Sequence, residues 1–258
     1  MIRADGHTLY IASDKCAGCA GYYSSTEGPL ALLLNRLTAV DIGKRFGRRF
    51  IFRHVHVEFA AGEVVAITGP NGSGKSTLLR ILAGLLTPTE GRIDASWNGS
   101  ESVDDLTRHV GFVAPYVNVY DSFTAAENLA FLVRLRRLGG GNATIERALR
   151  EVGLEAAANQ EVGTYSSGMK QRLKLAMAVI HDPAVLMFDE PSSNLDAAGR
   201  RVVTELIEAH RERGRIVLVA TNIDDEAAVC DRQVNVAEFV ASIARQAHRR
   251  NSDVVKTD

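Results

Sequence analysis

The sequence predicts an α/β sandwich, in which helices pack against a largely parallel sheet, with a strand-rich edge and a helical arm. Three short apolar runs at 64–67, 185–188 and 216–220 have the length and the uniform hydrophobicity of strands that are buried on both faces. The first two precede stretches with helical apolar spacing, which begin at Thr77 and Ala197. Because 46% of the 258 residues are hydrophobic, the chain can bury one sizeable core and a small subdomain.

The N-terminal part of the chain supplies the strand-rich edge. Residues 1–34 include a Gly/Ser-rich leader and are expected to form a flexible extension. Residues 37–63 alternate between apolar and polar positions, as half-buried strands do. His54 and His56 belong to this alternation, so we expect them on the polar face of a strand.

The helical arm precedes the second buried strand. From about 116 to 164 the spacing is helical, with a capping box that starts at Thr124 and a break at the three glycines 139–141. A further helix is expected over 197–213, and residues 237–258 form a C-terminal tail with a polar end.

A phosphate-binding loop is predicted between the first buried strand and its helix. Residues 69–77 fit the pattern G-x-x-x-x-G-K-[ST], and strand, loop and helix follow in the order that this pattern requires. The glycines let backbone N–H groups curl around phosphates, Lys75 supplies a point charge, and the Ser76 hydroxyl supplies a ligand for Mg²⁺. We therefore predict that ATP or GTP binds at Gly69, Pro70, Asn71, Gly72, Ser73, Gly74, Lys75, Ser76 and Thr77.

Two acids follow the second buried strand. Asp189 stands at the carboxyl edge of the sheet, where ligands bind in open α/β sheets, and can hold Mg²⁺ through water. Glu190 follows directly and can act as the general base that polarises the attacking water. The alternative is a pair of solvated acids before the turn-forming Pro191, and the presence of Lys75 disfavours it.

A second anion site is predicted where residues 165–172, Tyr-Ser-Ser-Gly-Met-Lys-Gln-Arg, open a helix. Ser166, Ser167 and the N–H groups near Gly168 would then lie at the positive end of that helix. The local pattern alone also fits an ordinary Ser/Gly N-cap on an amphipathic helix.

Residues 165–169 resemble the signature motif of the ATP-binding cassette (ABC) family, which is usually Leu-Ser-Gly-Gly-Gln. The phosphate loop, the signature and the acidic strand also occur in the family's order, and the match runs from about Leu37 to Asp231. The resemblance implies a P-loop NTPase sandwich over 35–236, with ATP and Mg²⁺ as cofactors and ATP hydrolysis as the activity. Residues 116–164 then correspond to the family's helical subdomain, which docks on the membrane partner.

Two further residues take family positions. Asp196, in Ser-Asn-Leu-Asp, resembles part of the D-loop, which crosses the dimer interface and positions the opposite site. Phe46 takes the place of the aromatic residue, usually Tyr, that stacks on adenine, and stacking needs only a ring. A core phenylalanine is the alternative.

The chain departs from the family pattern at two positions. Pro115 stands where the family has a Gln that binds Mg²⁺ and the lytic water, and Pro has no side-chain acceptor, so Tyr116 or Asn118 would have to reach instead. Asn222 stands where the family's switch His contacts the γ-phosphate, and Asn donates a hydrogen bond but carries no positive charge. More of the catalysis then depends on Glu190, and slow turnover is expected.

Partners follow from the resemblance. Family members close head to tail, so that Lys75 of one copy faces Ser166 and Gly168 of another, which implies a second cassette in a homodimer or heterodimer. No apolar run approaches the ~18 residues of a membrane span, so a separate transmembrane permease is implied. The N-terminus lacks the apolar core of a signal peptide, and we expect a peripheral protein on the cytoplasmic side of the inner membrane, held there only through the permease.

A net charge of −1 gives no basic field for nucleic acid. Cys16 and Cys19 form a lone Cys-x-x-Cys in the leader, without the second ligand pair or the strand–helix context that metal or redox chemistry needs. Cys230 lies apart from them in a helix-like stretch. No nucleic-acid, metal–thiolate or redox role is therefore predicted.

The leading functional hypothesis is the ATPase subunit of an exporter, since residues 165–172 look most like exporter-type ATPases, including those for haem export in cytochrome c maturation. Two alternatives stay open. One is a degenerate, non-hydrolysing ATP-binding switch subunit of an asymmetric pair, which Pro115 and Asn222 favour and Glu190 disfavours. The other is a soluble ABC ATPase outside transport, although the chain shows neither paired cassettes nor a long coiled coil.

Overall fold

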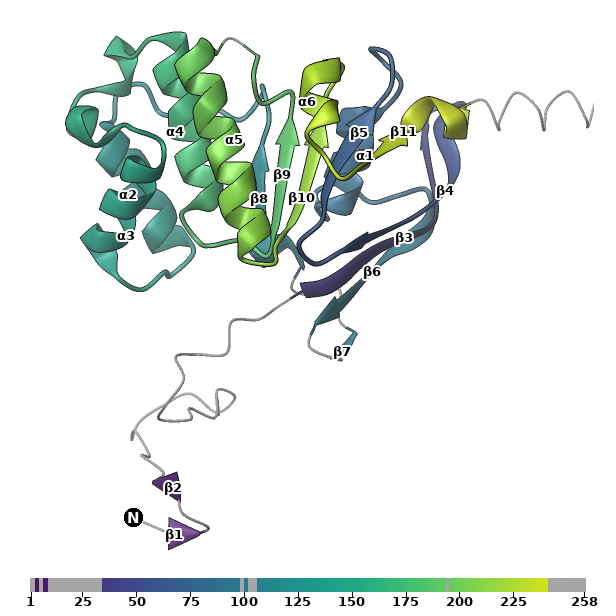
Figure 1. Cartoon of the computed structure of the whole chain (residues 1–258), viewed down its shortest axis with the longest axis horizontal. Helices are drawn as coiled ribbons and strands as arrows, with labels where there is room; N and C mark the ends of the chain where they lie inside the picture. Colours follow the sequence, from purple (N-terminus) through teal and green to yellow (C-terminus); the bar gives the residue numbers. More distant parts are fainter. Residues whose placement is uncertain are drawn as a thin grey trace, which may run out of the picture. The chain divides into compact units, whose positions relative to one another are not determined.

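The computed structural model describes residues 3–4, 7–8, 34–97, 100–101, 106–193 and 195–240. The chain divides into two compact units, 1–31 and 32–258. In the first unit, strands β1 (Arg3–Ala4) and β2 (His7–Thr8) pair antiparallel. The second unit contains all the other described helices and strands (Figure 1).

A five-stranded sheet forms the centre of the second unit. Its order is β11-β5-β10-β9-β8, and all neighbouring strands run parallel. The strands are β5 (Val64–Thr68), β8 (Val110–Val113), β9 (Val185–Asp189), β10 (Ile216–Ala220) and β11 (Arg232–Asn235). Nearly every residue of β5, β9 and β10 is buried, which confirms the three buried strands predicted from the apolar runs.

A four-stranded antiparallel sheet forms the strand-rich edge, in the order β4-β3-β6-β7. Its strands are β3 (Leu34–Phe46), β4 (Arg49–Ala60), β6 (Glu90–Trp97) and β7 (Ser100–Glu101). Buried and exposed residues alternate along the second half of β4, and both His54 and His56 are exposed. Their predicted place on the polar face of a strand is confirmed.

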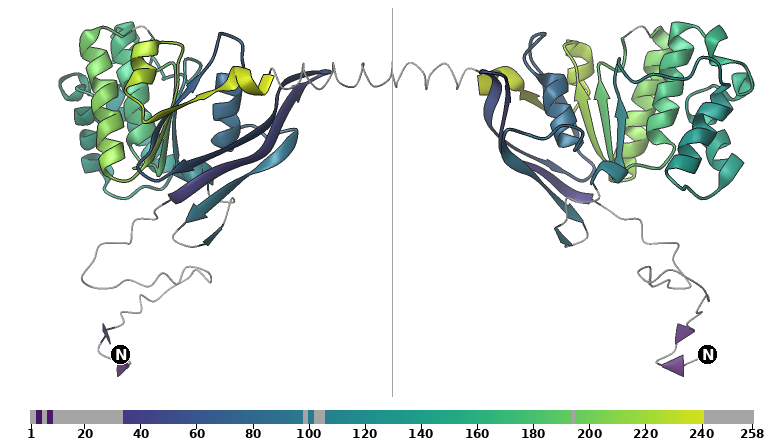
Figure 2. Two further views of the ribbon diagram at one scale, coloured as in Figure 1. Left: turned by 45° about the vertical axis from the view of Figure 1, so that its right-hand side comes forward. Right: turned by 180° about the vertical axis from the view of Figure 1, so that it is seen from behind.

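The parallel sheet separates two hydrophobic cores, because side chains alternate between the faces of a strand. Val65 and Met187 pack with the antiparallel sheet and with α1 (Lys75–Leu82). Leu186 and Phe188 pack on the other face with the remaining long helices. Helix α1 therefore lies between the two sheets, whereas α4 (Ser167–Val179) and α5 (Ala197–Glu212) cover the opposite face of the parallel sheet (Figures 1 and 2). The predicted helix over 197–213 is confirmed as α5.

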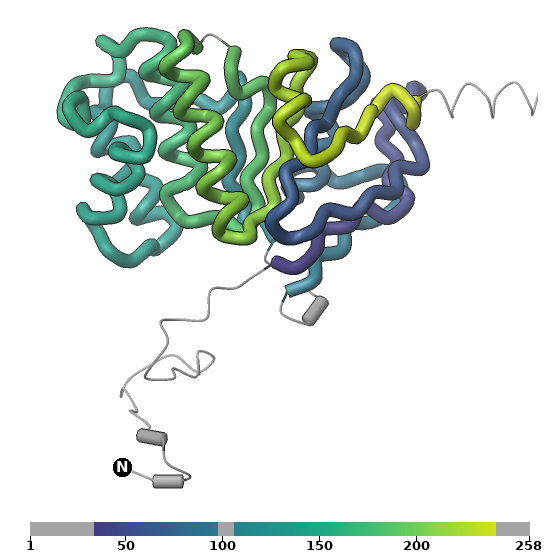
Figure 3. Tube along the Cα trace, viewed as in Figure 1, coloured from purple at the N-terminus to yellow at the C-terminus, as the bar shows by residue number. Residues whose placement is uncertain are grey.

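The helical arm leaves the sheet after β8 and returns to it through α4 (Figure 3). It contains α2 (Ala125–Leu135), α3 (Gly141–Glu151) and short 3-10 turns at Glu155–Ala157 and Val162–Thr164. A further 3-10 turn, at Leu106–His109, lies just before β8 and outside the arm. The side chains and backbone N–H groups of Thr124 and Glu127 bond reciprocally, so the predicted capping box is confirmed. Gly140 precedes α3 with a φ of 83°, a left-handed conformation that favours glycine.

The described chain ends after α6 (Asp224–Ala228) and β11. Phe239 and Val240 pack against the core that contains α1, and the rest of the predicted tail lies outside the described residues. The boundaries predicted at 34/35 and 236/237 remain predictions. Within the described ranges, no helix is long and apolar enough to cross a membrane.

Candidate functional site

Residues 69–77 connect the carboxyl end of β5 to α1. Three of their glycines have positive φ: 137° at Gly69, 79° at Gly72 and 104° at Gly74. At Gly74 a β-carbon would come within 2.6 Å of the Ile51 side chain, so both the conformation and the space require glycine. This loop delivers the free N–H groups at the start of α1 to one place, which makes an anion site.

Lys75 is buried at the base of this loop, with 6% of its surface exposed. Its Nζ donates hydrogen bonds to the carbonyl oxygens of Gly69 at 2.8 Å and Pro70 at 3.3 Å. Carbonyl oxygens satisfy the ammonium donors but do not neutralise the charge, so the group is suited to a phosphate. In the part of the chain that the structure describes, the buried hydroxyl of Ser73 has no hydrogen-bond partner, a further sign of a missing polar ligand.

Ser76 and Asp189 meet where α1 begins and β9 ends. The Ser76 hydroxyl donates to Oδ1 of Asp189 over 2.9 Å, and Asp189 is only 3% exposed. Burial raises the pKa of Asp189, the hydrogen bond from Ser76 opposes the rise, and the negative charge of Glu190 adds to it. A buried carboxylate beside a hydroxyl oxygen is a donor set that Mg²⁺ accepts, and the cation would favour the ionised form.

Glu190 and Asn222 lie at the same edge of the sheet. The Glu190 N–H donates to the carbonyl of Ala220, and Ala220 is paired with Asp189 across β9 and β10. Glu190 has a φ of 53°, a left-handed conformation that is costly for a residue with a side chain. The Asn222 amide donates to Oδ1 of Asn71 over 3.3 Å, so Asn222 contacts the loop itself.

The two predicted anion sites do not meet within one chain. Ser166 is the N-cap of α4, and its hydroxyl accepts a hydrogen bond from the N–H of Met169 over 3.2 Å. Ser166 and Ser167 are exposed at the start of this helix and Gly168 is half-buried. Helix α4 packs on one face of the parallel sheet and α1 on the other, so these residues belong to a different surface from Lys75.

Asp196 has a structural contact that the sequence did not predict. Its Oδ1 accepts a hydrogen bond from the N–H of Gly199 over 2.7 Å, which caps α5. Asn194, in the same predicted D-loop, lies outside the described residues. The role of Asp196 at a dimer interface remains a prediction.

Phe46 ends β3 with 53% of its surface exposed, so the alternative of a core phenylalanine is wrong. Lys44 Nζ lies 5.2 Å from the centre of the ring. The exposed ring leaves room for a base to stack, but adenine stacking remains a prediction.

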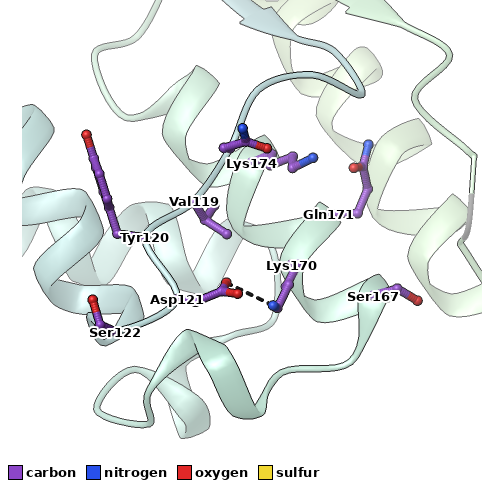
Figure 4. Close-up of a pocket in the computed structure, with 9 residues that line it drawn as sticks. Val119, Tyr120, Asp121, Ser122, Ser167, Lys170, Gln171 and Lys174 are labelled. Carbon is purple, nitrogen blue, oxygen red and sulfur yellow. Dashed lines mark hydrogen bonds and ion pairs between the residues drawn. The ribbon is translucent and has the colours of Figure 1, made fainter.

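Beyond Pro115, the two residues that could replace the missing Gln go to different places. The Tyr116 hydroxyl accepts a hydrogen bond from Arg80, a residue of α1 that the sequence reasoning missed. The signal for Arg80 was its position one turn after Ser76. Asn118 instead lines a cavity of about 730 Å³, together with Lys170, Gln171 and Lys174 of α4 (Figure 4).

Metal sites made of His, Cys, Asp or Glu clusters are absent from the described ranges. Cys16 and Cys19 lie outside those ranges. Cys230 is half-buried, and burial raises the pKa of its thiol to about 11, which leaves it unreactive at neutral pH.

Comparisons with known proteins agree with this geometry. A family model described as "ABC transporter" matches residues 52–193, more than half of the chain. Over 224 residues the chain is 33% identical to the probable multidrug ABC transporter ATP-binding protein YbhF of Escherichia coli (strain K12), covering 82% of this chain and 39% of that protein. Over 203 residues it is 32% identical to the lantibiotic transport ATP-binding protein SrtF of Streptococcus pyogenes, covering 79% of this chain and 84% of that protein.

A solved structure shows the same fold. The dimeric post-hydrolysis state of the ATP-binding cassette MJ0796, bound to ADP and Pi, superposes with a TM-score of 0.67 and 27% identity, covering 77% of this chain and 93% of that chain. The predicted P-loop sandwich with its strand-rich edge and helical arm is thereby confirmed. Neither YbhF nor SrtF is named for haem export, so the expectation of haem export in cytochrome c maturation has no support here.

Proposed function

This chain belongs to the ABC transporter family, and on that premise we propose that it is the ATP-binding and ATP-hydrolysing subunit of an exporter that works with a separate transmembrane permease. The hydrogen bond from Ser76 to the buried Asp189, beside Lys75, is the observation that carries the proposal. The Lys75 ammonium attracts phosphate, and the Asp189 carboxylate attracts a metal cation. Because both groups lie at the glycine-rich start of α1, the site fits a magnesium–triphosphate complex.

Each residue has a defined role in the proposed reaction. The loop N–H groups and Lys75 bind the β- and γ-phosphates, and Ser76 and Asp189 would hold Mg²⁺. When bound, Mg²⁺ neutralises charge on the phosphate oxygens. Glu190 accepts a proton from the attacking water, and Asn222 donates a hydrogen bond to the γ-phosphate.

Lys75→Ala tests the binding site. Removing the only charge that the loop offers should weaken ATP binding about a hundredfold, since charge-assisted hydrogen bonds to phosphate contribute about 1.5–3 kcal/mol each. Calorimetry gives the affinity, and phosphate release with Mg-ATP gives the activity. Arg92→Ala is the matched control, because that side chain is 71% exposed on β6. Parent-like ATP affinity in Lys75→Ala would sink the phosphate-loop assignment.

Two copies are needed in the proposed cycle. Since Ser166, Ser167 and Gly168 lie on a different surface from Lys75, we propose that they bind the ATP of a second copy. Asp196, the N-cap of α5, would then lie near that interface. The similarity to a dimeric cassette supports this arrangement. The partner is either an identical chain or a related one.

The permease contact is proposed on the helical arm. An apolar cavity of about 180 Å³ lies between the end of α1, β8, α2 and α4, lined in part by Leu85, Phe112, Val117 and Leu132. Leu85 is 58% exposed, so its side chain is accessible to a partner at this cavity. Binding there would hold the subunit on the cytoplasmic side of the inner membrane. Co-expression with an adjacent gene product that has several apolar spans tests this; a chain that never co-purifies with such a product contradicts it.

The non-hydrolysing switch is the second candidate, and the absence of a side-chain acceptor at Pro115 favours it. Phosphate release decides between the two: a parent that binds Mg-ATP but shows no turnover above that of Glu190→Gln is a switch. Glu190, at the strained turn after β9, favours the hydrolysing subunit.

A further inference from the structure

Arg80 and Tyr116 form a contact beside the Ser76–Asp189 pair. Arg80 Nε donates a hydrogen bond to the Tyr116 hydroxyl over 2.9 Å, and its guanidinium lies 4.1 Å from the centre of the ring. Arg80 stands one turn after Ser76 on α1, so both side chains leave the same face of the helix. One face of α1 therefore contacts both Asp189 and Tyr116.

The segment that carries Tyr116 leaves the sheet next to the metal-binding carboxylate. Val113, the last residue of β8, is paired with Phe188, and Asp189 follows Phe188. Tyr116 is 46% exposed, and burial of the other part raises the pKa of its hydroxyl, which Arg80 opposes. The phenol thus keeps its proton at neutral pH while its oxygen accepts from Arg80, so the proton is available for donation.

The same segment is tied to α4 on its other side. Lys174 Nζ donates to the carbonyl of Pro115 over 3.2 Å, and Lys170 pairs with Asp121 over 2.8 Å (Figure 4). Gln171, between them, donates to the carbonyl of Pro191, two residues after Asp189. Residues 115–121 therefore bridge α1 and the helix that begins at Ser167.

We propose that Tyr116, held by Arg80, is a positioning residue that transmits magnesium–nucleotide binding at Ser76 and Asp189 to residues 115–121 and from there to α4. The Arg80–Tyr116 pair joins α1 to residues 115–121 through side chains. Pro115 cannot make such a contact, because it has no side-chain acceptor. Bound nucleotide holds the start of α1 and the Asp189 side chain in one position. Arg80, on the same face of α1, then holds the ring of Tyr116 in one position as well. This inference rests on the proposed nucleotide-binding function.

Hydrogen exchange separates this role from simple packing. The probe is Mg-ATP, compared with ATP in EDTA and with no nucleotide, on the full chain. In the parent, Mg-ATP should slow exchange of the amides at 116–122. Tyr116→Phe keeps the ring under the guanidinium and removes only the hydroxyl, so it should lose most of that slowing, by about tenfold, the ratio one hydrogen bond typically contributes. Its ATP affinity by calorimetry should change by less than about threefold.

Tyr120→Phe is the matched control, because Tyr120 is an exposed tyrosine of the same segment whose ring packs on Phe123 and Phe131. It should keep the parent's slowing. Arg80→Ala should lose it, and the double variant Arg80→Ala/Tyr116→Phe should lose no more than either single variant, because residues that act as a unit are not additive. Parent-like slowing in Tyr116→Phe and Arg80→Ala, or additive losses in the double variant, would overturn the proposal. A parent that binds no ATP by calorimetry overturns the proposed function itself, and the inference with it, before any variant is compared.

Discussion

Asn222 contacts the phosphate loop through Asn71, so the residue that departs from the family's His lies at the predicted site. Its amide can donate to a phosphate oxygen, but it adds no positive charge where charge develops in the transition state. In the proposed site the loop and Lys75 would hold the ground-state phosphates, so we expect the Asn at this position to lower the rate of hydrolysis and to leave ATP binding intact.

Asn222→His should raise the rate of phosphate release at saturating Mg-ATP. One donor to developing charge is typically worth about a hundred- to a thousandfold in kcat, which sets the upper limit, and Pro115 should keep the gain well below it. Asn222→Ala, which removes the donor, is the control and should be slower than the parent. An Asn222→His rate equal to or below the parent's would show that this position does not limit turnover.

The pKa of His181 predicts how the free energy of unfolding depends on pH. Its Nε2 lies 3.2 Å from the carbonyl of Val110, and burial, with the nearby Arg136 charge, lowers its pKa to about 4. The native state therefore holds the neutral ring, while the unfolded chain takes up a proton near pH 6.5. The contribution of His181 to the free energy of unfolding is fully present above pH 6.5. It is lost as the pH falls toward 4, by at most roughly 1.4 kcal/mol per pH unit.

Urea unfolding between pH 7 and 4 measures this loss. His181→Asn should reduce the pH dependence and leave the part that comes from His210, whose pKa burial also lowers. His56→Asn, at an exposed position of β4, should leave it as in the parent. Parallel curves for the parent and His181→Asn would contradict the assigned pKa.

Helix α2 shows how far local sequence determines structure. Thr124 and Glu127 are three residues apart, and their reciprocal hydrogen bonds form as the pattern predicts. The buried strands β5, β9 and β10 could also be predicted from the sequence, because strands covered on both faces are apolar throughout. These patterns involve only residues that are close together in the sequence, so they can be recognised without knowing which distant segments meet in the fold.

The cap of α2 should be measurable as stability. Thr124→Ala removes the acceptor for the Glu127 N–H and should lower the free energy of unfolding by about 1 kcal/mol. Thr204→Ala is the control, since Thr204 is an exposed residue inside α5 whose hydroxyl bonds only its own helix, at Arg200. Thermal unfolding of both variants gives the comparison. Equal midpoints for Thr124→Ala and the parent would show that the cap contributes nothing.

Contacts between distant segments could not be read in advance. Arg80 and Tyr116 are 36 residues apart, and Gln171 and Pro191 are 20 residues apart. No short-range sequence pattern therefore predicts either hydrogen bond. Asp196 was expected at an interface, yet its carboxylate also caps α5, a role that Asp fills in any helix. The sequence located the phosphate loop and the two acids, but only the folded sheet shows that Asp189, Glu190 and Asn222 share one edge with it.

The two predicted anion sites belong to helices that pack in different cores of the protein. Helix α1 packs in one core and α4 in the other, so the sheet lies between the helix that begins at Lys75 and the helix that the exposed Ser166 caps. A site that needs both must be completed by a second chain. ATP should therefore act as the ligand that joins two copies, and hydrolysis should release them.

Glu190→Gln tests this account, because an amide keeps the shape of the side chain but cannot accept the proton from water. Mg-ATP should stay bound without hydrolysis, and the stalled complex should accumulate as a dimer. The measurement is gel filtration of Glu190→Gln with Mg-ATP, with Mg-ADP and without nucleotide, beside phosphate release. We expect a dimer with Mg-ATP alone and no phosphate release. A variant that hydrolyses ATP at the parent rate, or that stays monomeric with Mg-ATP bound, would contradict the account.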